Sequence, residues 1–309
     1  MDSDGQTSRY GEKQESVIQE GAILEHPRIS CLIPTYERHA WLKECLLALA
    51  ADPYENKEII VINDGGSRPD EQLRLEDLPD IKWIHMEENQ GHVRARNAGL
   101  KIATGDYILL CDDDDLLIPG HLSHLIKLAM ENSPGIWHAD AEIIWYRTMQ
   151  NLRTPLSRRT FAMNFDPQLL RKYNTIIPSG ILYPIALHEK WGLFDETMED
   201  YWDWDFFLRM STQYPIYRMP YASVLYLVSE EGNNLSAKKD RMQQSLLRLI
   251  EKHSLGELPV GSFPLMVNDP ILREYWQLTS RVWSGRLESG KKLVDPTSAF
   301  LYSLLQRQE

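Results

Sequence analysis

Short apolar runs alternate with amphipathic segments along the first third of the chain, and this alternation predicts the fold class. Four runs are apolar or alternating and are bounded by turn-forming residues, which is typical of buried strands: 28–34, 57–63, 81–86 and 106–111. Between them, segments 40–51 and 93–103 place apolar residues at helical spacing. Strands and helices that alternate in this way indicate an α/β fold with a mostly parallel sheet covered by helices on both faces.

The rest of the chain is less regular. Segments 135–147 and 217–228 have strand-like composition, 157–174 is expected to form a loop and a short helix, and a helix is expected at 202–210. Three amphipathic helical patterns follow, at 239–253, 271–283 and 296–306. The sequence therefore predicts a polar N-terminal extension (1–27), an α/β domain (28–236) and a helical C-terminal region (237–309).

The composition indicates a globular, acidic protein. The chain has 45 acidic and 33 basic residues, a net charge of −12, and 43% apolar residues. This balance disfavours nucleic-acid binding, because recognition of phosphate needs clustered cations. No signal peptide or membrane-spanning apolar run occurs, and three unclustered cysteines favour neither a disulfide framework nor a zinc site. We expect a cytoplasmic protein; peripheral membrane contact and a homodimer both stay open.

Acidic and polar turns follow three of the predicted strands, at 35–38, 63–66 and 112–115. Ligands of open parallel sheets bind beyond the carboxyl ends of the strands, so these turns are expected on one rim. If Asp112 to Asp115 continue a strand, alternation turns Asp112 and Asp114 to the same side, as two oxygen ligands for Mn²⁺ or Mg²⁺. A solvated acidic turn is the alternative. Arg94 and Arg96 open a predicted helix, where cations and free amides favour phosphate.

Six sequence blocks follow one another in a set order. They are 33–36 (IPTY), 62–67 (INDGGS), 89–99 (NQGHVRARNAG), 105–119 (GDYILLCDDDDLLIP), 192–196 (GLFDE) and 202–209 (WDWDFFLR). Together they resemble family 2 glycosyltransferases of GT-A fold, over about residues 28–236. The resemblance implies an enzyme that binds a nucleotide-diphosphate sugar and transfers the sugar with inversion.

The resemblance also implies which residues bind the donor. Asp64 would accept a hydrogen bond from a ring N–H of the base, which favours UDP weakly, and Arg96 would lie near the diphosphate. Asp112 to Asp114 would match the Asp-x-Asp element that contacts ribose and the metal, with Asp112 and Asp114 as metal ligands. The full set expected to contact the nucleotide is Pro34, Thr35, Tyr36, Glu37, Asp64, Arg96, Asp112 and Asp113.

On the acceptor side, the resemblance implies that Asp203 is the general base of a single displacement. Trp202 stands where the family pattern has Glu, and the acidic pair Glu199 and Asp200 lies just upstream, so Asp200 stays open as an alternative base. The acceptor could be a glycan, a lipid-linked sugar, a peptide or a small molecule. Two other functions stay open as well: a catalytically impaired protein that binds sugar nucleotides, and a nucleotidyltransferase.

Overall fold

A computed structural model describes residues 26–73, 81–149, 152–230, 239–258 and 269–281. The strands are β1 (Ile29–Thr35), β2 (Lys57–Asn63), β3 (Ile81–His85), β4 (Tyr107–Leu110), β5 (Leu116–Leu117), β6 (Ile136–Met149), β7 (Leu152–Phe161), β8 (Leu182–Pro184), β9 (Ile216–Ser229) and β10 (Ser280–Arg281). The helices are α2 (His39–Ala50), α3 (Pro69–Gln72), α4 (His92–Ile102), α5 (His121–Glu131), α6 (Pro167–Leu170), α7 (Leu187–Trp191), α8 (Trp202–Met210), α9 (Lys239–His253) and the 3₁₀ helix η2 (Ile271–Tyr275).

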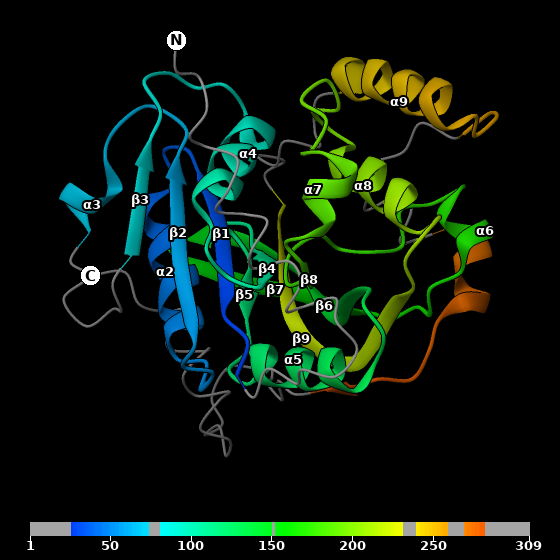
Figure 1. Cartoon of the computed structure of the whole chain (residues 1–309), viewed down its shortest axis with the longest axis horizontal. Helices are drawn as coiled ribbons and strands as arrows, with labels where there is room; N and C mark the ends of the chain where they lie inside the picture. The colour runs from blue at the N-terminus through cyan, green and yellow to red at the C-terminus, as the bar shows by residue number, and fades with distance from the viewer. Residues whose placement is uncertain (1–25, 74–80, 150–151, 231–238, 259–268, 282–309) are drawn as a thin grey trace, which may run out of the picture.

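One mixed sheet forms the centre of the molecule, in the order β10-β9-β6-β8-β4-β1-β2-β3 (Figure 1). Strands β4, β1, β2 and β3 are parallel neighbours, and β6, β9 and β10 are also parallel. Strand β8 runs antiparallel to both β4 and β6. The short strand β5 and the long strand β7 pair antiparallel with β9 and β6. The expected mostly parallel α/β sheet is therefore confirmed, with antiparallel strands added in its second half.

Each face of the sheet has its own apolar core. Along β1, Cys31 and Ile33 pack with α2 and α5 on one face, and Leu32 packs with α4, α7 and α8 on the other. This division follows from the alternation of side chains along a strand. Helix α9 adds Met242, Leu246 and Leu249 to the second core, beside α8 (Figure 1).

The expected elements of the first third are confirmed within one or two residues, and so are α8 and the strands β6 and β9. The expectation of a loop at 157–174 is partly wrong, because its first residues belong to β7. Strand β7 pairs antiparallel with β6, starting at Ala141 and Phe161, with a register shift between Trp145 and Tyr146. A cross-strand partner of this kind is invisible to local periodicity, which explains the error.

The C-terminal expectations have mixed outcomes. The helix at 239–253 is confirmed as α9. The helix at 271–283 is wrong: a 3₁₀ turn ends at Tyr275, and Ser280–Arg281 pairs with β9. Hydrogen bonding to the edge of the sheet has prevailed over helical spacing there. The helix expected at 296–306, and residues 1–25 of the N-terminal extension, lie outside the described residues. Among the described residues, no helix combines the length and apolar character needed to span a membrane.

Candidate active site

The carboxyl ends of β1, β2 and β4 meet at one rim of the sheet, as expected. Thr35 at the end of β1 is in register with Asn63 at the end of β2. The Thr35 hydroxyl donates a hydrogen bond of 2.7 Å to Asp113 Oδ2, which ties the end of β1 to the turn after β4. The three turns singled out in the sequence therefore surround one location.

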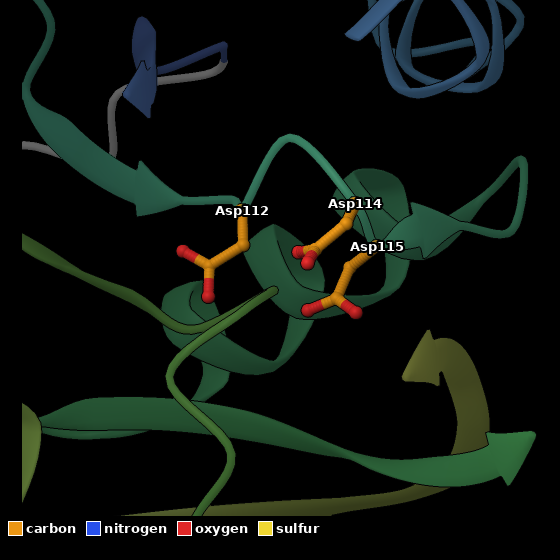
Figure 2. A group of neighbouring side chains, drawn as sticks. All are labelled: Asp112, Asp114 and Asp115. Atoms are coloured by element: carbon orange, nitrogen blue, oxygen red, sulfur yellow. The ribbon is translucent and has the colours of Figure 1, made fainter. Parts of the chain in front are cut away.

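Three carboxylates of the turn after β4 come together. Asp112, Asp114 and Asp115 each offer an oxygen, and these oxygens lie within 4.8 Å of one another. Figure 2 shows the three side chains on the turn between β4 and β5. Asp112 pairs with Arg96, Asp114 pairs with Arg38 at 2.9 Å, and Asp115 Oδ1 accepts from the Leu227 N–H at 3.1 Å. Asp115 Oδ2 is buried and has no hydrogen-bond partner in the described part of the chain.

The local geometry differs from the one assumed in the sequence analysis. Strand β4 ends at Leu110, and the aspartates form a turn in which the Asp115 N–H donates to the Asp112 carbonyl at 3.2 Å. Strand alternation therefore does not apply, and Asp115 joins Asp112 and Asp114. Its adjacency in sequence to the other two was the available signal, but the alternation rule placed it on the opposite side.

Asp113 is directed into the protein. It accepts hydrogen bonds from Thr35 and from Arg38, the latter at 3.2 Å, and it is buried. Burial and the neighbouring Asp114 carboxylate together raise the pKa of Asp113 to about 7, against the opposing effect of Arg38. Arg38 belongs to the turn at 35–38 that was expected on this rim, but the sequence analysis assigned it no role.

The expected nucleotide residues of β1 and β2 lie along the same rim. Pro34 is a buried residue of β1, whereas Tyr36 is 47% exposed. Glu37 has a positive φ of 53° and accepts hydrogen bonds from the backbone and hydroxyl of Ser67. Asp64 accepts from the N–H groups of Gln90 and Gly91, both at 2.8 Å. These contacts hold the loops that follow β1, β2 and β3 against one another.

Arg96 connects the aspartate turn to the start of α8. Its guanidinium contacts Asp112, donates to His92 Nδ1 at 2.7 Å, and lies 4.1 Å from the ring centroid of Trp202. Burial and the Arg96 charge lower the pKa of His92 to about 4, so this imidazole is neutral and accepts from Arg96. Trp202, which stands where the family pattern has Glu, thus packs on the guanidinium that pairs with Asp112.

Asp203 lies in the first turn of α8 and is 8% exposed. Asn174 Nδ2 donates to Asp203 Oδ2 at 2.7 Å. Burial, with a smaller contribution from Asp112, raises the pKa of Asp203 to about 6, and hydrogen bonds from helix N–H groups and from Asn174 oppose this increase. A carboxylate with a pKa near neutrality suits a general base. Asn174 was missed, since the sequence offers no motif around it.

The two neighbouring aspartates are held by cations. Asp205 is fully buried and pairs with Arg209 at 3.0 Å, as expected for residues one helical turn apart, and also with Lys252 and His253 of α9. Asp200 pairs with Arg241 of α9 at 2.5 Å and accepts from Ser245 at 3.0 Å. Asp203 has no such cationic partner among the described residues, which distinguishes it from both.

Comparison with known proteins identifies relatives of this chain. The profile of "Glycosyl transferase family 2" matches residues 30–187. The glycosyltransferase YwdF of Bacillus subtilis is 41% identical over 261 residues, covering 84% of this chain and 96% of YwdF. A glycosyltransferase of Rickettsia typhi, RT0329, is 30% identical over 194 residues, covering 61% of each chain.

Solved structures share the fold. S. aureus TarS 1–349 in complex with UDP-GlcNAc matches with a TM-score of 0.56 and 18% identity, over 74% of this chain and 67% of that one. The mannosyltransferase PcManGT of Pyrobaculum calidifontis, in complex with GDP-Man and Mn²⁺, matches with a TM-score of 0.51 and 18% identity, over 85% of this chain and 74% of that one. The described α/β architecture is therefore the GT-A type.

Proposed function

Because the chain belongs to glycosyl transferase family 2, we propose that it transfers a sugar from a nucleotide-diphosphate donor to an acceptor hydroxyl with inversion, using a divalent cation. The observation that carries this proposal is the contact of Arg96 with both Asp112 and Trp202. It joins the aspartate turn, where a donor diphosphate would bind, to the first turn of α8, which carries Asp203. Family membership favours this reading over a nucleotidyltransferase.

The residues of the aspartate turn fit a cation such as Mn²⁺ or Mg²⁺. Three carboxylates offer oxygens within 4.8 Å of one another, and carboxylate oxygens are the ligands that such hard cations prefer. The buried Asp115 Oδ2, which lacks a hydrogen-bond partner among the described residues, is a further indication that the turn is completed by a ligand. Asp112, Asp114 and Asp115 would hold the cation, which supplies a Lewis acid for the negative charge on the departing diphosphate.

The donor would occupy the rim formed by β1, β2 and β4. Thr35 to Glu37 and Asp64 would contact the nucleoside, and Arg96 would contact the diphosphate. A ring N–H of uracil suits the Asp64 carboxylate, as does one of thymine or guanine, so a UDP-sugar is favoured only weakly. TarS has been crystallised with UDP-GlcNAc and PcManGT with GDP-Man and Mn²⁺, which supports a sugar nucleotide as the donor class.

The chemical step would depend on Asp203. Its ionised carboxylate accepts the proton of the acceptor hydroxyl while that oxygen attacks the anomeric carbon from the face opposite the nucleotide. The bond between the anomeric carbon and the diphosphate oxygen breaks, and the diphosphate leaves with the electron pair. Asp205 and Asp200 are poorer candidates for the base, because cations already occupy their carboxylates.

The test is release of UDP from UDP-sugars, measured in a coupled assay with Mn²⁺ and again with EDTA. We expect release with Mn²⁺, its loss with EDTA, and its loss in the Asp203→Asn variant. A protein that only binds sugar nucleotides would bind UDP in calorimetry and release none under either condition. Release that persists undiminished in EDTA would refute the dependence on a cation and leave the transfer itself in place.

A further inference from the structure

Asn174 lies in the loop between α6 and β8, and its side-chain amide is directed at Asp203. Nδ2 donates to Asp203 Oδ2 at 2.7 Å. The other amide atom, Oδ1, is buried and has no hydrogen-bond partner within the described ranges. A flipped amide would place Oδ1 against the carboxylate oxygen, so the orientation with Nδ2 toward Asp203 is the one that satisfies an ionised carboxylate.

We infer that Asn174 is a positioning residue for the catalytic base, holding the Asp203 carboxylate ionised and in one orientation. The inference rests on the proposed function, because it takes Asp203 as the base. A hydrogen bond donated to a carboxylate favours its charged form, which opposes the effect of burial. The same contact engages Oδ2 and so restricts rotation of the carboxylate. An amide whose own oxygen is buried and finds no partner among the described residues makes this contact at a cost to the folded state, which argues against a purely structural role.

Other groups around Asp203 come from three further parts of the fold. N–H groups at the start of α8 lower its pKa, and Asp112 after β4 raises it. The nearby phenols are those of Tyr201, before α8, and Tyr226 on β9, and burial together with neighbouring carboxylates raises the pKa of both. Both phenols therefore stay neutral through the range in which Asp203 titrates. Variants of Asn174 leave all of these groups in place, so a change in the titration of Asp203 reports the lost hydrogen bond.

The experiment is a ¹³C NMR titration of the carboxyl group of Asp203 in the full chain labelled at aspartate, with the signal assigned from Asp203→Asn. In Asn174→Ala, we expect the midpoint to move upward by about one pH unit, the effect of losing a hydrogen bond to a charged group. In Asn174→Asp, which keeps the shape of the side chain, two carboxylates in contact share a proton, so the midpoint should move further still.

Asn132→Ala is the matched control. Asn132 is also half-buried, and its Nδ2 donates one hydrogen bond of 2.7 Å, to the Leu128 carbonyl at the end of α5. This variant should leave the midpoint unchanged. A midpoint that stays at the wild-type value in both Asn174 variants, with wild-type-like melting curves, would overturn the inference.

A pH–rate profile of UDP release from UDP-GlcNAc separates this inference from the proposed function. If Asp203→Asn abolishes release, the acidic limb of the pH–rate profile of Asn174→Ala should move upward in pH by the same amount as the NMR midpoint of Asp203 in that variant. If Asp203→Asn releases UDP at the wild-type rate, the proposed base is wrong, whatever the titration shows. If Asp203→Asn is inactive and the acidic limb of Asn174→Ala does not move, only the role of Asn174 is lost.

Discussion

Two aspartates that lie two residues apart on α8 should respond oppositely to replacement by asparagine. Burial raises the pKa of Asp203 from about 4 to about 6, which means that the ionised carboxylate is up to about 3 kcal/mol less stable in the folded chain than in the unfolded one. Asp203→Asn removes this cost at neutral pH and can still accept the hydrogen bond from Asn174. The melting temperature should therefore equal or exceed that of the wild type.

Replacement of Asp205 should change the stability of the fold in the opposite direction, by lowering it. Hydrogen bonds from His253 and Lys252 and the charge of Arg209 outweigh burial and lower the pKa of Asp205, so its ionised form stabilises the fold and this contribution is lost as pH falls. Asp205→Asn leaves three cationic or polar groups around a neutral side chain. We expect a loss of about 2–4 kcal/mol, somewhat below the usual value for a broken buried pair, because Lys252 is 32% exposed and can be hydrated.

Activity should separate the same variants. Asp203→Asn should reduce transfer at least ~100-fold, the lower end of a general-base contribution, and leave the affinity for UDP unchanged in calorimetry. Asp205→Asn should retain transfer at temperatures where it is folded. Differential scanning calorimetry gives the melting temperature of each variant. Transfer is then measured as UDP release at a temperature 20 °C below that melting temperature. If Asp200→Asn abolishes transfer and Asp203→Asn does not, the assignment of the base is wrong.

Other contacts of the site make four further predictions. Transfer by the wild type should fall about tenfold per pH unit below about pH 6, because only ionised Asp203 accepts a proton; a pH–rate profile checks this. Asp114→Asn should weaken the binding of UDP with Mn²⁺ by about tenfold or more in calorimetry, through loss of a ligand oxygen, without lowering the melting temperature. Arg38→Met should instead raise the affinity for Mn²⁺ in the absence of nucleotide several-fold, because Arg38 forms an ion pair with the Asp114 carboxylate and competes with the cation for it. Electron paramagnetic resonance of Mn²⁺ measures this affinity. Arg241→Met should lower the melting temperature by several degrees and reduce kcat more than UDP affinity. The reason is that the buried Asp200, just before α8, loses its ion pair. Calorimetry and steady-state kinetics test these two effects.

Much of the fold could be predicted from local patterns. The strands and helices of the first third are encoded by apolar runs and helical spacing, which depend on neighbouring residues alone. The rim also followed, because the carboxyl ends of parallel strands lie at one edge of the sheet. The contact between Thr35 and Asp113 bears this out. The family blocks then pointed to Asp112, Asp114 and Asp203 without any coordinates.

Contacts between distant segments could not be predicted in this way. The pairing of β7 with β6 joins residues up to 20 positions apart. The return of Ser280–Arg281 to β9 and the approach of Asn174 to Asp203 join residues about 30 to 60 positions apart, and no local period encodes any of these contacts. The same is true of Arg38 at the aspartate turn and of Arg241 at Asp200.

The sequence by itself therefore determined the class of fold, the rim at which we propose that its ligands bind, and the residue types available for the chemistry. Only the tertiary structure decided which of three aspartates near α8 has no cationic partner in the described part of the chain, and which neighbours set its charge. The physical reason is that ionisation depends on burial and on partners brought from α9, β4 and the loop before β8, and these distances exist only in the folded chain.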